Sequence, residues 1–163
     1  LFNKPNSAIT NILNFISEDT RFESEICFLI KDENIVGIGL GLDLTKGIIQ
    51  KKLKKAGLPW ERAKGFDGSA VFSDFVPFNG DITKLRYQLS VNDELQQEAN
   101  YDLMIYKPNE ILEEIKSFMT LEDGDIIMSG TPRGTTTYEE CDLFRGTVYC
   151  KDDVLLEACW EAV

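Results

Sequence analysis

The sequence contains no histidine. This absence excludes Ser-His and Cys-His nucleophilic pairs, and histidine metal ligands, among these residues. The four cysteines, at positions 27, 141, 150 and 159, show no CxxC spacing and lie in apolar, strand-like runs. We therefore expect reduced structural cysteines and no redox or zinc motif. Any metal bound by this chain must be held by oxygen ligands.

Long apolar runs and an excess of basic residues are also missing. No stretch approaches the roughly 20 apolar residues of a membrane span, and the N-terminus has no signal-peptide pattern. The 28 acidic residues outnumber the 17 basic ones, which gives a net charge of -11. This charge disfavours nucleic acid and membrane surfaces as partners. We expect a soluble cytoplasmic protein in which an anionic substrate needs a locally positive site.

The remaining composition predicts one folded domain that spans residues 1–163. A hydrophobic content of 43% supplies a sizeable core, and there are no repeats or linkers rich in Pro, Gly or Ser. Apolar runs and turn residues predict two strands, at 21–31 and 35–43, and two hairpins, at 84–98 and 145–162. Because strands outnumber helices and come as hairpins, we expect an α+β fold that is mainly β.

Two helices complete the predicted elements. Residues 46–56 read as a helix that Thr45 caps and Gly57 ends, and residues 109–119 as a helix that follows Pro108. Helical spacing predicts buried side chains in both, at Ile48, Ile49, Leu53, Ile111, Leu112, Ile115, Phe118 and Met119. Residues 58–78, rich in Gly, Pro and aromatics, read as an irregular functional loop.

An unusual pair of acidic residues opens the first strand. Glu23 and Glu25 precede the apolar run 26–30, and they share one strand face at a spacing of about 6.5 to 7 Å. At an effective dielectric of 20, their charges repel by about 2 to 3 kcal/mol. A solvated strand end is one explanation of such a pair. A bound cation is the other.

Asp43 favours the cation. It ends the second strand near the point where Glu23 and Glu25 begin the first, and antiparallel neighbours lie about 4.8 Å apart. Three carboxylates can therefore converge. A set of oxygen ligands without His or Cys favours Mg²⁺, Mn²⁺ or Ca²⁺ over zinc.

Several motifs together resemble the fumarylacetoacetate hydrolase family over residues 4–162. They are KPNSAI (4–9), ESE (23–25), LDLT (42–45) with Gln50, GLPWERAKGFD (57–67), VND (91–93) with Gln97, and GDIIMSGTPRG (124–134). Each motif alone is weakly specific, whereas their order and spacing together are strongly specific.

The resemblance implies a mixed β-roll with a few short helices and a Mg²⁺ or Mn²⁺ site. By position, Glu23, Glu25 and Asp43 would be the ligands. In this family the metal chelates the 2-oxo acid end of a small substrate, such as an acylpyruvate or oxaloacetate, and stabilises the enolate that forms. The resemblance also assigns Lys64 and Gln50 as donors to substrate oxygens, and Thr131 as a contact of the substrate carboxylate. A homodimer is expected on resemblance alone.

Two departures from the family pattern concern catalysis. Family members usually carry an arginine and an acidic residue after the LDLT-like motif, where this chain has Gly47 and Ile48. The catalytic histidine of hydrolytic members lies on a lid upstream of the KPNSAI-like segment, close to where this sequence starts, at Leu1 without an initiator Met. Either the lid belongs to an upstream segment, or the protein lacks it.

We interpret the chain as a Mg²⁺-dependent enzyme that cleaves a C–C bond in a small 2-oxo or 2,4-dioxo acid, as an acylpyruvate or fumarylacetoacetate-like hydrolase. Decarboxylation of oxaloacetate or keto–enol tautomerisation on the same site is the alternative, since both need mainly an electron sink. A non-catalytic relative that keeps the β-roll but lacks the lid is a third reading.

Overall fold

A long antiparallel hairpin forms the centre of the molecule. The computed structural model describes residues 2–163. In it β2 (Thr20–Lys31) and β3 (Asn34–Lys46) pair along nearly their whole lengths, and Asp32 and Glu33 turn the chain with positive φ angles. The middle of β2 is buried on both faces, which is what its apolar run predicted.

Shorter strands extend this hairpin into one sheet and form a second. The first sheet has seven strands in the order β1-β4-β3-β2-β8, with β5 paired to β3 and β9 to β2. The second has four antiparallel strands in the order β11-β10-β6-β7. The bounds of these strands are β1 Ile9–Thr10, β4 Ala70–Phe72, β5 Val76–Pro77, β6 Leu85–Val91, β7 Glu94–Asn100, β8 Ile126–Met128, β9 Thr136–Thr137, β10 Leu143–Cys150 and β11 Asp153–Glu161.

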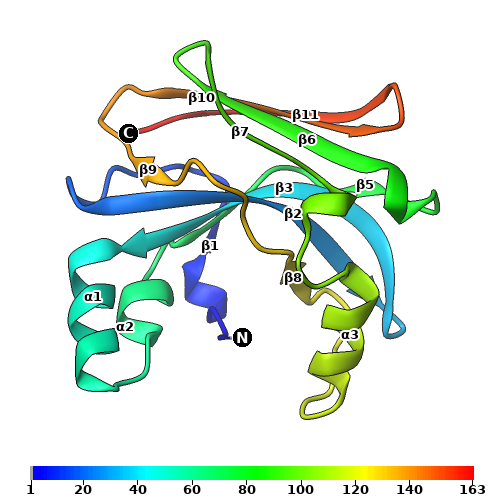
Figure 1. The fold of residues 1–163 in the computed structure, drawn as a ribbon, viewed down its shortest axis with the longest axis horizontal. Coiled ribbons are helices and arrows are strands. Elements are labelled where there is room, and N and C mark those ends of the chain that lie inside the picture. The colour runs from blue at the N-terminus through cyan, green and yellow to red at the C-terminus, as the bar shows by residue number, and fades with distance from the viewer. Residues whose placement is uncertain (1) are drawn as a thin grey trace.

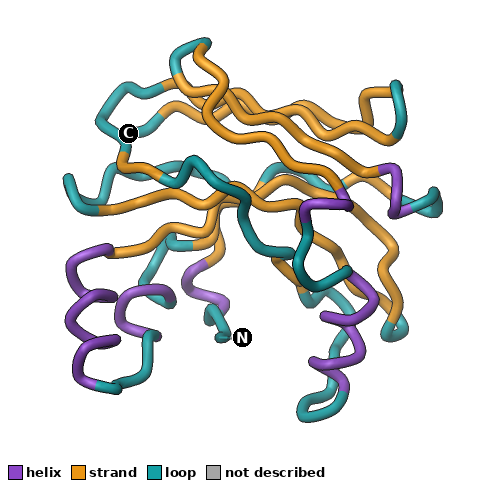
Figure 2. The backbone as a smooth tube through the Cα atoms, viewed as in Figure 1, coloured by secondary structure: helices purple, strands orange, loops and turns teal. Residues whose placement is uncertain are grey.

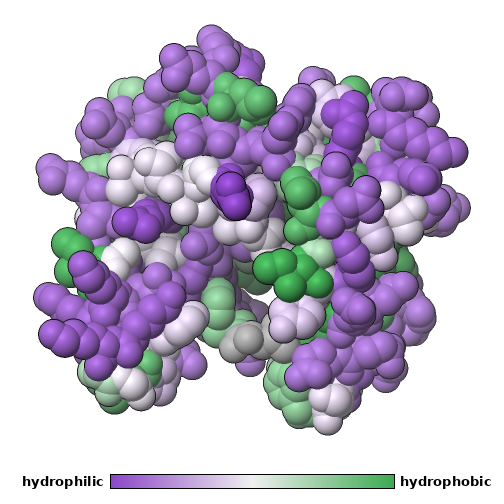
Figure 3. Space-filling view, viewed as in Figure 1, coloured by the Kyte–Doolittle hydropathy of each residue, from purple (hydrophilic) through white to green (hydrophobic). Residues whose placement is uncertain are grey.

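The two sheets and the helices form layers. The four-stranded sheet covers one face of the seven-stranded sheet, and the helices lie on the other side, with α1 and α2 apart from α3 (Figures 1 and 2). The helices are α1 Gly47–Ala56, α2 Glu61–Lys64, α3 Pro108–Lys116 and the 3-10 turns η1 Asn6–Ala8, η2 Ile82–Lys84 and η3 Tyr101–Leu103. Most of the visible surface is hydrophilic, and the outline is hollowed between the α1–α2 side and the α3 side (Figure 3).

The main core lies between the two sheets. Even-numbered side chains of β2 and β3 point into it, and aromatic rings fill its centre, with the Phe22 and Phe144 ring centroids 4.9 Å apart and edge-on. Gly146 of β10 allows the sheets to approach closely, because a Cβ there would lie 2.1 Å from Leu40 Cδ2. Burial of these apolar surfaces is the main stabilising force of the fold.

A smaller apolar cluster lies on the opposite face of the seven-stranded sheet. It consists of Ala8, Cys27, Ala70 and Phe72, and it borders the odd-numbered positions of β2 that carry the two glutamates. Gly41 of β3 is necessary there, because a Cβ would lie 2.6 Å from Cys27 Sγ. The glycines of GIGLGL therefore permit the close packing that the sequence predicted.

The expected fold class is confirmed. Among residues 2–163 the chain forms mainly strands with three short α-helices, and the predicted hairpins are present around Asn92–Asp93 and near Asp152. Gly57 ends α1 in the left-handed conformation, as predicted. No helix of the described residues combines the length and the apolar content of a membrane span.

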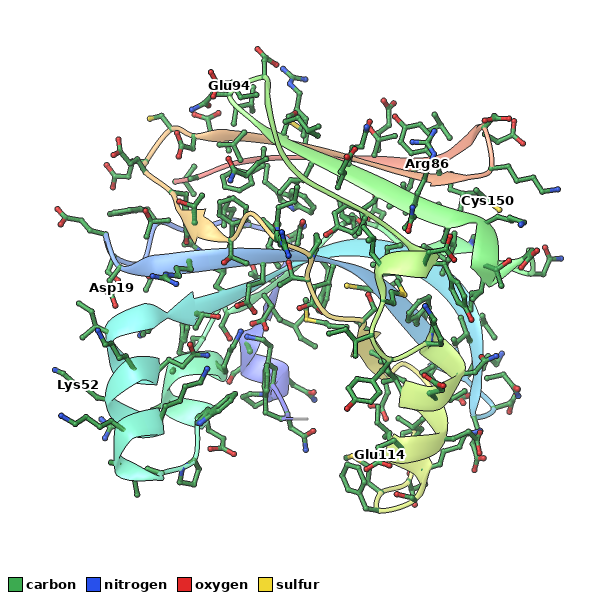
Figure 4. All side chains as sticks on the ribbon, viewed as in Figure 1. Asp19, Lys52, Arg86, Glu94, Glu114 and Cys150 are labelled. Carbon is green, nitrogen blue, oxygen red and sulfur yellow. The ribbon has the colours of Figure 1, made fainter. Side chains whose placement is uncertain are left out.

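Some expectations for the helices are wrong. Thr45 does not cap α1, because β3 continues to Lys46; the free N–H groups at Gly47 and Ile48 are bound instead by Asp19, which lies beside the start of α1 (Figure 4). Ile48 is 56% exposed, and none of the α1 side chains is fully buried. Phe118 lies beyond the end of α3 and is 60% exposed.

Other local expectations also need correction. Residues 58–78 are not wholly irregular, since they contain α2, β4 and β5. The four cysteines are all free thiols, but only Cys27 is buried, whereas Cys141 and Cys159 are exposed. Trp160 of β11 is 6% exposed and belongs to the core.

Candidate metal centre

Three carboxylates converge where β2 and β3 lie side by side. The strand register pairs Glu23 with Asp43, and Glu25 with Gly41. One carboxylate oxygen from each of the three acidic residues lies within 4.8 Å of the others. Glu25 and Asp43 are 5% and 2% exposed, and Glu23 is half-buried at the open side of the cluster. The convergence expected from strand geometry is thus present.

Lys64 connects two of these carboxylates. Its Nζ lies 2.6 Å from Glu23 Oε2 and 2.7 Å from Asp43 Oδ2, and the residue is 2% exposed. The last turn of α2 carries it into the cluster. Burial lowers the pKa of Lys64, but the carboxylates of Asp43 and Glu23 outweigh burial, so the pKa lies above its ordinary value. Lys64 is therefore a buried ammonium that supplies the local positive charge of the site.

Lys4 is a second buried lysine, and the sequence analysis gave it no role. Its Nζ lies 2.7 Å from Asp43 Oδ1 and donates hydrogen bonds to the backbone carbonyls of Lys64 and Ser69. Burial lowers the pKa of Lys4 despite the neighbouring Asp43. The only sequence feature that pointed to Lys4 was its place in the KPNSAI motif, and the neighbouring residues do not indicate that its side chain is buried.

Glu25 is buried and is held by the backbone of a neighbouring loop. Its Oε2 accepts a hydrogen bond from the backbone N–H of Gly130 at 2.5 Å. Burial, followed by the Asp43 carboxylate, raises the pKa of Glu25 to about 8, and the Gly130 N–H opposes the shift. Cys27, on the same strand face, is a fully buried thiol whose pKa burial raises well above its ordinary value. Its Sγ lies 3.4 Å from the backbone carbonyl oxygen of Glu25.

The donor set fits a hard divalent cation. The three converging ligand atoms are all carboxylate oxygens, and Asp43 Oδ1 is buried and accepts no hydrogen bond, although Lys4 Nζ lies 2.7 Å from it. Such carboxylate oxygens are suitable ligands for Mg²⁺ or Mn²⁺. Lys64 would compete with a cation, because it binds Glu23 and Asp43 through its own charge.

The other two predicted site residues differ in how closely they approach the cluster. Thr131 lies one residue after Gly130, which binds Glu25, and Thr131 Oγ1 accepts a hydrogen bond from Gln97 Nε2 at 2.9 Å. Gln50 is half-buried in the first turn of α1, and within residues 2–163 its amide forms no hydrogen bond to the cluster. Its role stays a prediction.

Gly47, where the family resemblance led us to expect an arginine, has a specific environment. It begins α1, and a Cβ at this position would lie 3.1 Å from the carbonyl oxygen of Asp19 and 3.5 Å from Arg21 Nε. Arg21 is on the same face of β2 as Glu23 and pairs across the hairpin with Thr45, whose buried hydroxyl has no partner among the described residues. The space beside Gly47 is therefore taken by an arginine from another element.

Comparisons with known proteins agree on one family. The profile described as fumarylacetoacetate (FAA) hydrolase C-terminal matches residues 31–159. That match includes Asp43, Gln50, Lys64 and Thr131 and starts after the two glutamates.

Several curated relatives are oxaloacetate tautomerases. The Escherichia coli protein YcgM is 41% identical over 111 residues, which cover 66% of this chain and 51% of the relative. The human mitochondrial protein FAHD1 is 43% identical over 108 residues, which cover 65% of this chain and 49% of the relative. The chain thus spans about half the length of the curated relatives that it matches.

Solved structures match nearly the whole chain. One from Oleispira antarctica has a TM-score of 0.94 at 30% identity and covers 99% of this chain and 81% of that one. The fumarylpyruvate hydrolase of Pseudomonas aeruginosa, solved with Mn²⁺ and pyruvate, has a TM-score of 0.88 at 25% identity and covers 99% and 77%.

Proposed function

Because this chain belongs to the fumarylacetoacetate hydrolase family, we propose that it carries the metal-binding core of an enzyme acting on small 2-oxo acids. We infer that its reaction is the keto–enol tautomerisation of an oxaloacetate-like substrate. The sequence alone favoured C–C cleavage and kept tautomerisation as the alternative. The alternative is the better supported of the two, since the relatives at 41% and 43% identity are oxaloacetate tautomerases.

One observation carries the proposal: three carboxylates converge beside a buried ammonium. Tautomerisation moves a proton from the carbon next to the keto group to the keto oxygen, and no water molecule is consumed. It therefore needs stabilisation of an enolate but no water-activating base.

The residues have separable roles in this proposal. Glu23, Glu25 and Asp43 would hold Mg²⁺ or Mn²⁺, and a bound divalent cation supplies Lewis-acid stabilisation of the enolate oxygen. Lys64 would donate a hydrogen bond to that oxygen, since its raised pKa keeps it charged, and the proton that leaves or joins the neighbouring carbon would be exchanged with solvent water. Thr131 would bind the substrate carboxylate through its hydroxyl or its amide, and Gln50 would be a second donor.

The test follows the ultraviolet absorbance of enol-oxaloacetate. With Mg²⁺ the protein should speed the loss of the enol above the buffer rate, and a chelator should abolish the difference. Asp43→Asn should reduce the rate at least 100-fold, whereas Asp152→Asn, in the exposed turn before β11, should leave it unchanged. Equal rates with Mg²⁺ and with chelator would refute the metal-dependent reaction.

Hydrolysis of a fumarylpyruvate-like acid is the second candidate. The Pseudomonas aeruginosa hydrolase that resembles this chain in fold holds Mn²⁺ and pyruvate. Hydrolysis also needs a group that activates water, so it would depend on residues outside this sequence. Release of pyruvate from acylpyruvates by the chain would support hydrolysis, and enol conversion without release would support tautomerisation alone. Absence of both reactions, with Mn²⁺ still bound, would favour the non-catalytic reading.

We also propose a homodimer, for which the support is the resemblance to the family. Light scattering coupled to size-exclusion chromatography would test it, since a mass of 18.5 kDa would identify the monomer.

A further inference from the structure

The edge of β2 has a gap beside the carboxylate cluster. On one side β3 pairs with β2 from Thr20 to Lys31. On the other side β9 pairs with Arg21 and Phe22, and β8 pairs with positions 27–29. On this second side, within the described residues, no strand pairs with Ser24, because the chain between β8 and β9 leaves the sheet as the 129–134 loop. The backbone between the two glutamates therefore needs other hydrogen-bond partners.

Two side chains of the four-stranded sheet fill this gap. Gln97 Oε1 of β7 accepts hydrogen bonds from the Ser24 N–H at 3.0 Å and the Ser24 hydroxyl at 2.8 Å. The Tyr87 hydroxyl of β6 donates to the Ser24 carbonyl at 2.6 Å. Gln97 and Tyr87 are each 2% exposed, and Ser24 is fully buried. Side chains thus replace the missing strand at the residue between the glutamates.

The other end of the Gln97 amide holds the loop. Its Nε2 donates to Thr131 Oγ1 at 2.9 Å and lies 3.4 Å from the carbonyl oxygens of Pro132 and Arg133. The orientation of the amide follows from its partners: the Ser24 N–H can only donate, so Oε1 must face it and Nε2 must face the loop. Only a side-chain amide both accepts and donates at this reach.

The loop is therefore attached to the cluster at two points. Glu25 binds the N–H of Gly130 directly, and Gln97 binds the next three residues and the backbone between the two glutamates. Neighbouring Gln96 adds a hydrogen bond from its Nε2 to the Gly134 carbonyl at 2.9 Å. A single buried residue of the second sheet thus joins the carboxylate strand to the loop that carries Thr131.

We propose that Gln97 is a positioning residue that sets the 129–134 loop against the carboxylate cluster, so that Thr131 meets the carboxylate of a metal-bound 2-oxo acid. The consequence for the substrate rests on the proposed function, whereas the coupling of loop and strand does not. Gln97 itself touches neither metal nor substrate. Its loss should weaken binding of the acid and leave metal binding nearly unchanged, because β3 still holds Glu23 and Glu25 in register.

The experiment compares Gln97→Met with Gln88→Met, a matched control on β6 whose side chain is half-buried and is bonded only to Glu98. Hydrogen exchange of the metal-free proteins should be at least tenfold faster in peptides covering Ser24 and 129–134 for Gln97→Met alone. Calorimetry should give a Kd for oxalate, on Mn²⁺-loaded protein, that is about tenfold higher for Gln97→Met, with the Mn²⁺ Kd within threefold of wild type.

Each other outcome has a definite meaning. Unchanged exchange in the 129–134 peptide would overturn the coupling, and an equal loss of Mn²⁺ and oxalate binding would reduce Gln97 to a general structural role. If Gln97→Met does not fold, Gln97→Glu is the second variant, because it keeps the acceptor for Ser24. Hydrogen exchange should then stay slow in the Ser24 peptide and become faster in the 129–134 peptide. Exchange equal to wild type in both peptides of that variant would refute the proposal. Wild-type protein that binds neither Mn²⁺ nor oxalate would refute the proposed function, and hydrogen exchange would still decide the coupling.

Discussion

At the scale of single residues, two lysines neutralise the acidic cluster. Lys64 takes one oxygen each of Glu23 and Asp43, and Lys4 faces the second oxygen of Asp43. Both ammonium groups are mostly buried, so neither charge is screened well by water. Lysine ammonium groups of the protein therefore occupy the region where the family resemblance implies a bound metal ion.

Replacing Lys64 should have opposite effects on stability and on metal binding. Lys64→Met leaves the buried carboxylates without their counter-ion, so the metal-free protein should lose about 3 kcal/mol of unfolding free energy. The Mn²⁺ Kd should fall roughly tenfold, because a competing positive charge is gone. Urea unfolding and calorimetry measure the two quantities. Lys52→Met, on the exposed face of α1 (Figure 4), is the control, and a higher Mn²⁺ Kd for Lys64→Met alone would contradict the competition.

The pKa of Glu25 predicts how stability depends on pH. It is about 8 in the folded protein and near 4.5 in the unfolded chain, so the folded state binds the extra proton between these values. The unfolding free energy of the metal-free protein should therefore fall from pH 5 to pH 8, by at most about 1.4 kcal/mol per unit for this group. Glu25→Gln should remove that slope. Urea titrations of both proteins at several pH values measure it, and parallel pH profiles would contradict the pKa assignment.

Residue roles were predictable only where strand alternation determines them. Side chains alternate between the two faces of a strand, which places Glu23 and Glu25 on the same face of β2. The hairpin that joins β2 to β3 then brings Asp43 beside Glu23. Lys4 and Gln97 were not assigned roles, because their partners lie 39 and 73 positions away, at Asp43 and Ser24, and no local pattern records such distances.

At the scale of elements, the β2–β3 hairpin builds the site by combining side chains with glycines. Gly41 faces Glu25 across the hairpin, and its missing side chain leaves room for Cys27 and Phe72. Strands 21–31 and 35–43 were predicted within a few residues of their bounds, because apolar β-branched and aromatic runs are strong strand signals. The start of α1 was misread, since its cap comes from Asp19, 29 residues before the N–H that it binds.

Gly41→Ala should distort this hairpin. Its Cβ would lie 2.6 Å from Cys27 Sγ and 2.9 Å from the Phe72 ring, so either β2 or β4 must move. We expect a loss of about 1 to 3 kcal/mol in unfolding free energy. Denaturant unfolding measures the loss. Because Cys27→Ala removes the nearer clash, the double variant should lose less than the sum of the two single variants, and simple additivity would argue against this contact.

At the scale of the whole molecule, the site depends on a core that it does not touch. The four-stranded sheet packs against the face of β2 and β3 opposite the carboxylates, through Phe22, Phe144 and Tyr138 (Figure 1). The predicted hairpins were enough to identify the fold class as α+β and mainly β. The pairing of the sheets was implied only by the family resemblance, because it depends on contacts between distant segments.

Phe144→Ala should therefore destabilise the molecule without changing the chemistry of the site. Phe144 is fully buried and its ring lies 4.9 Å from Phe22, so we expect a loss of about 3 to 5 kcal/mol. Phe118→Ala, at a 60% exposed position, should change stability by less than about 0.5 kcal/mol. Denaturant unfolding compares the two, and similar losses for both would contradict the assignment of the core.

The inward turn of Lys4 affects how the protein should be prepared. At Lys4, three residues after the first position, the chain already contacts Asp43. The N-terminus lies on the helix side of the seven-stranded sheet, whereas the C-terminus lies near the four-stranded one (Figure 1). An oligohistidine tag joined before Leu1 would bring imidazoles next to a centre whose own sequence has none. Spectra and metal titrations recorded with such a tag would include nitrogen ligands that the residues of the centre do not supply.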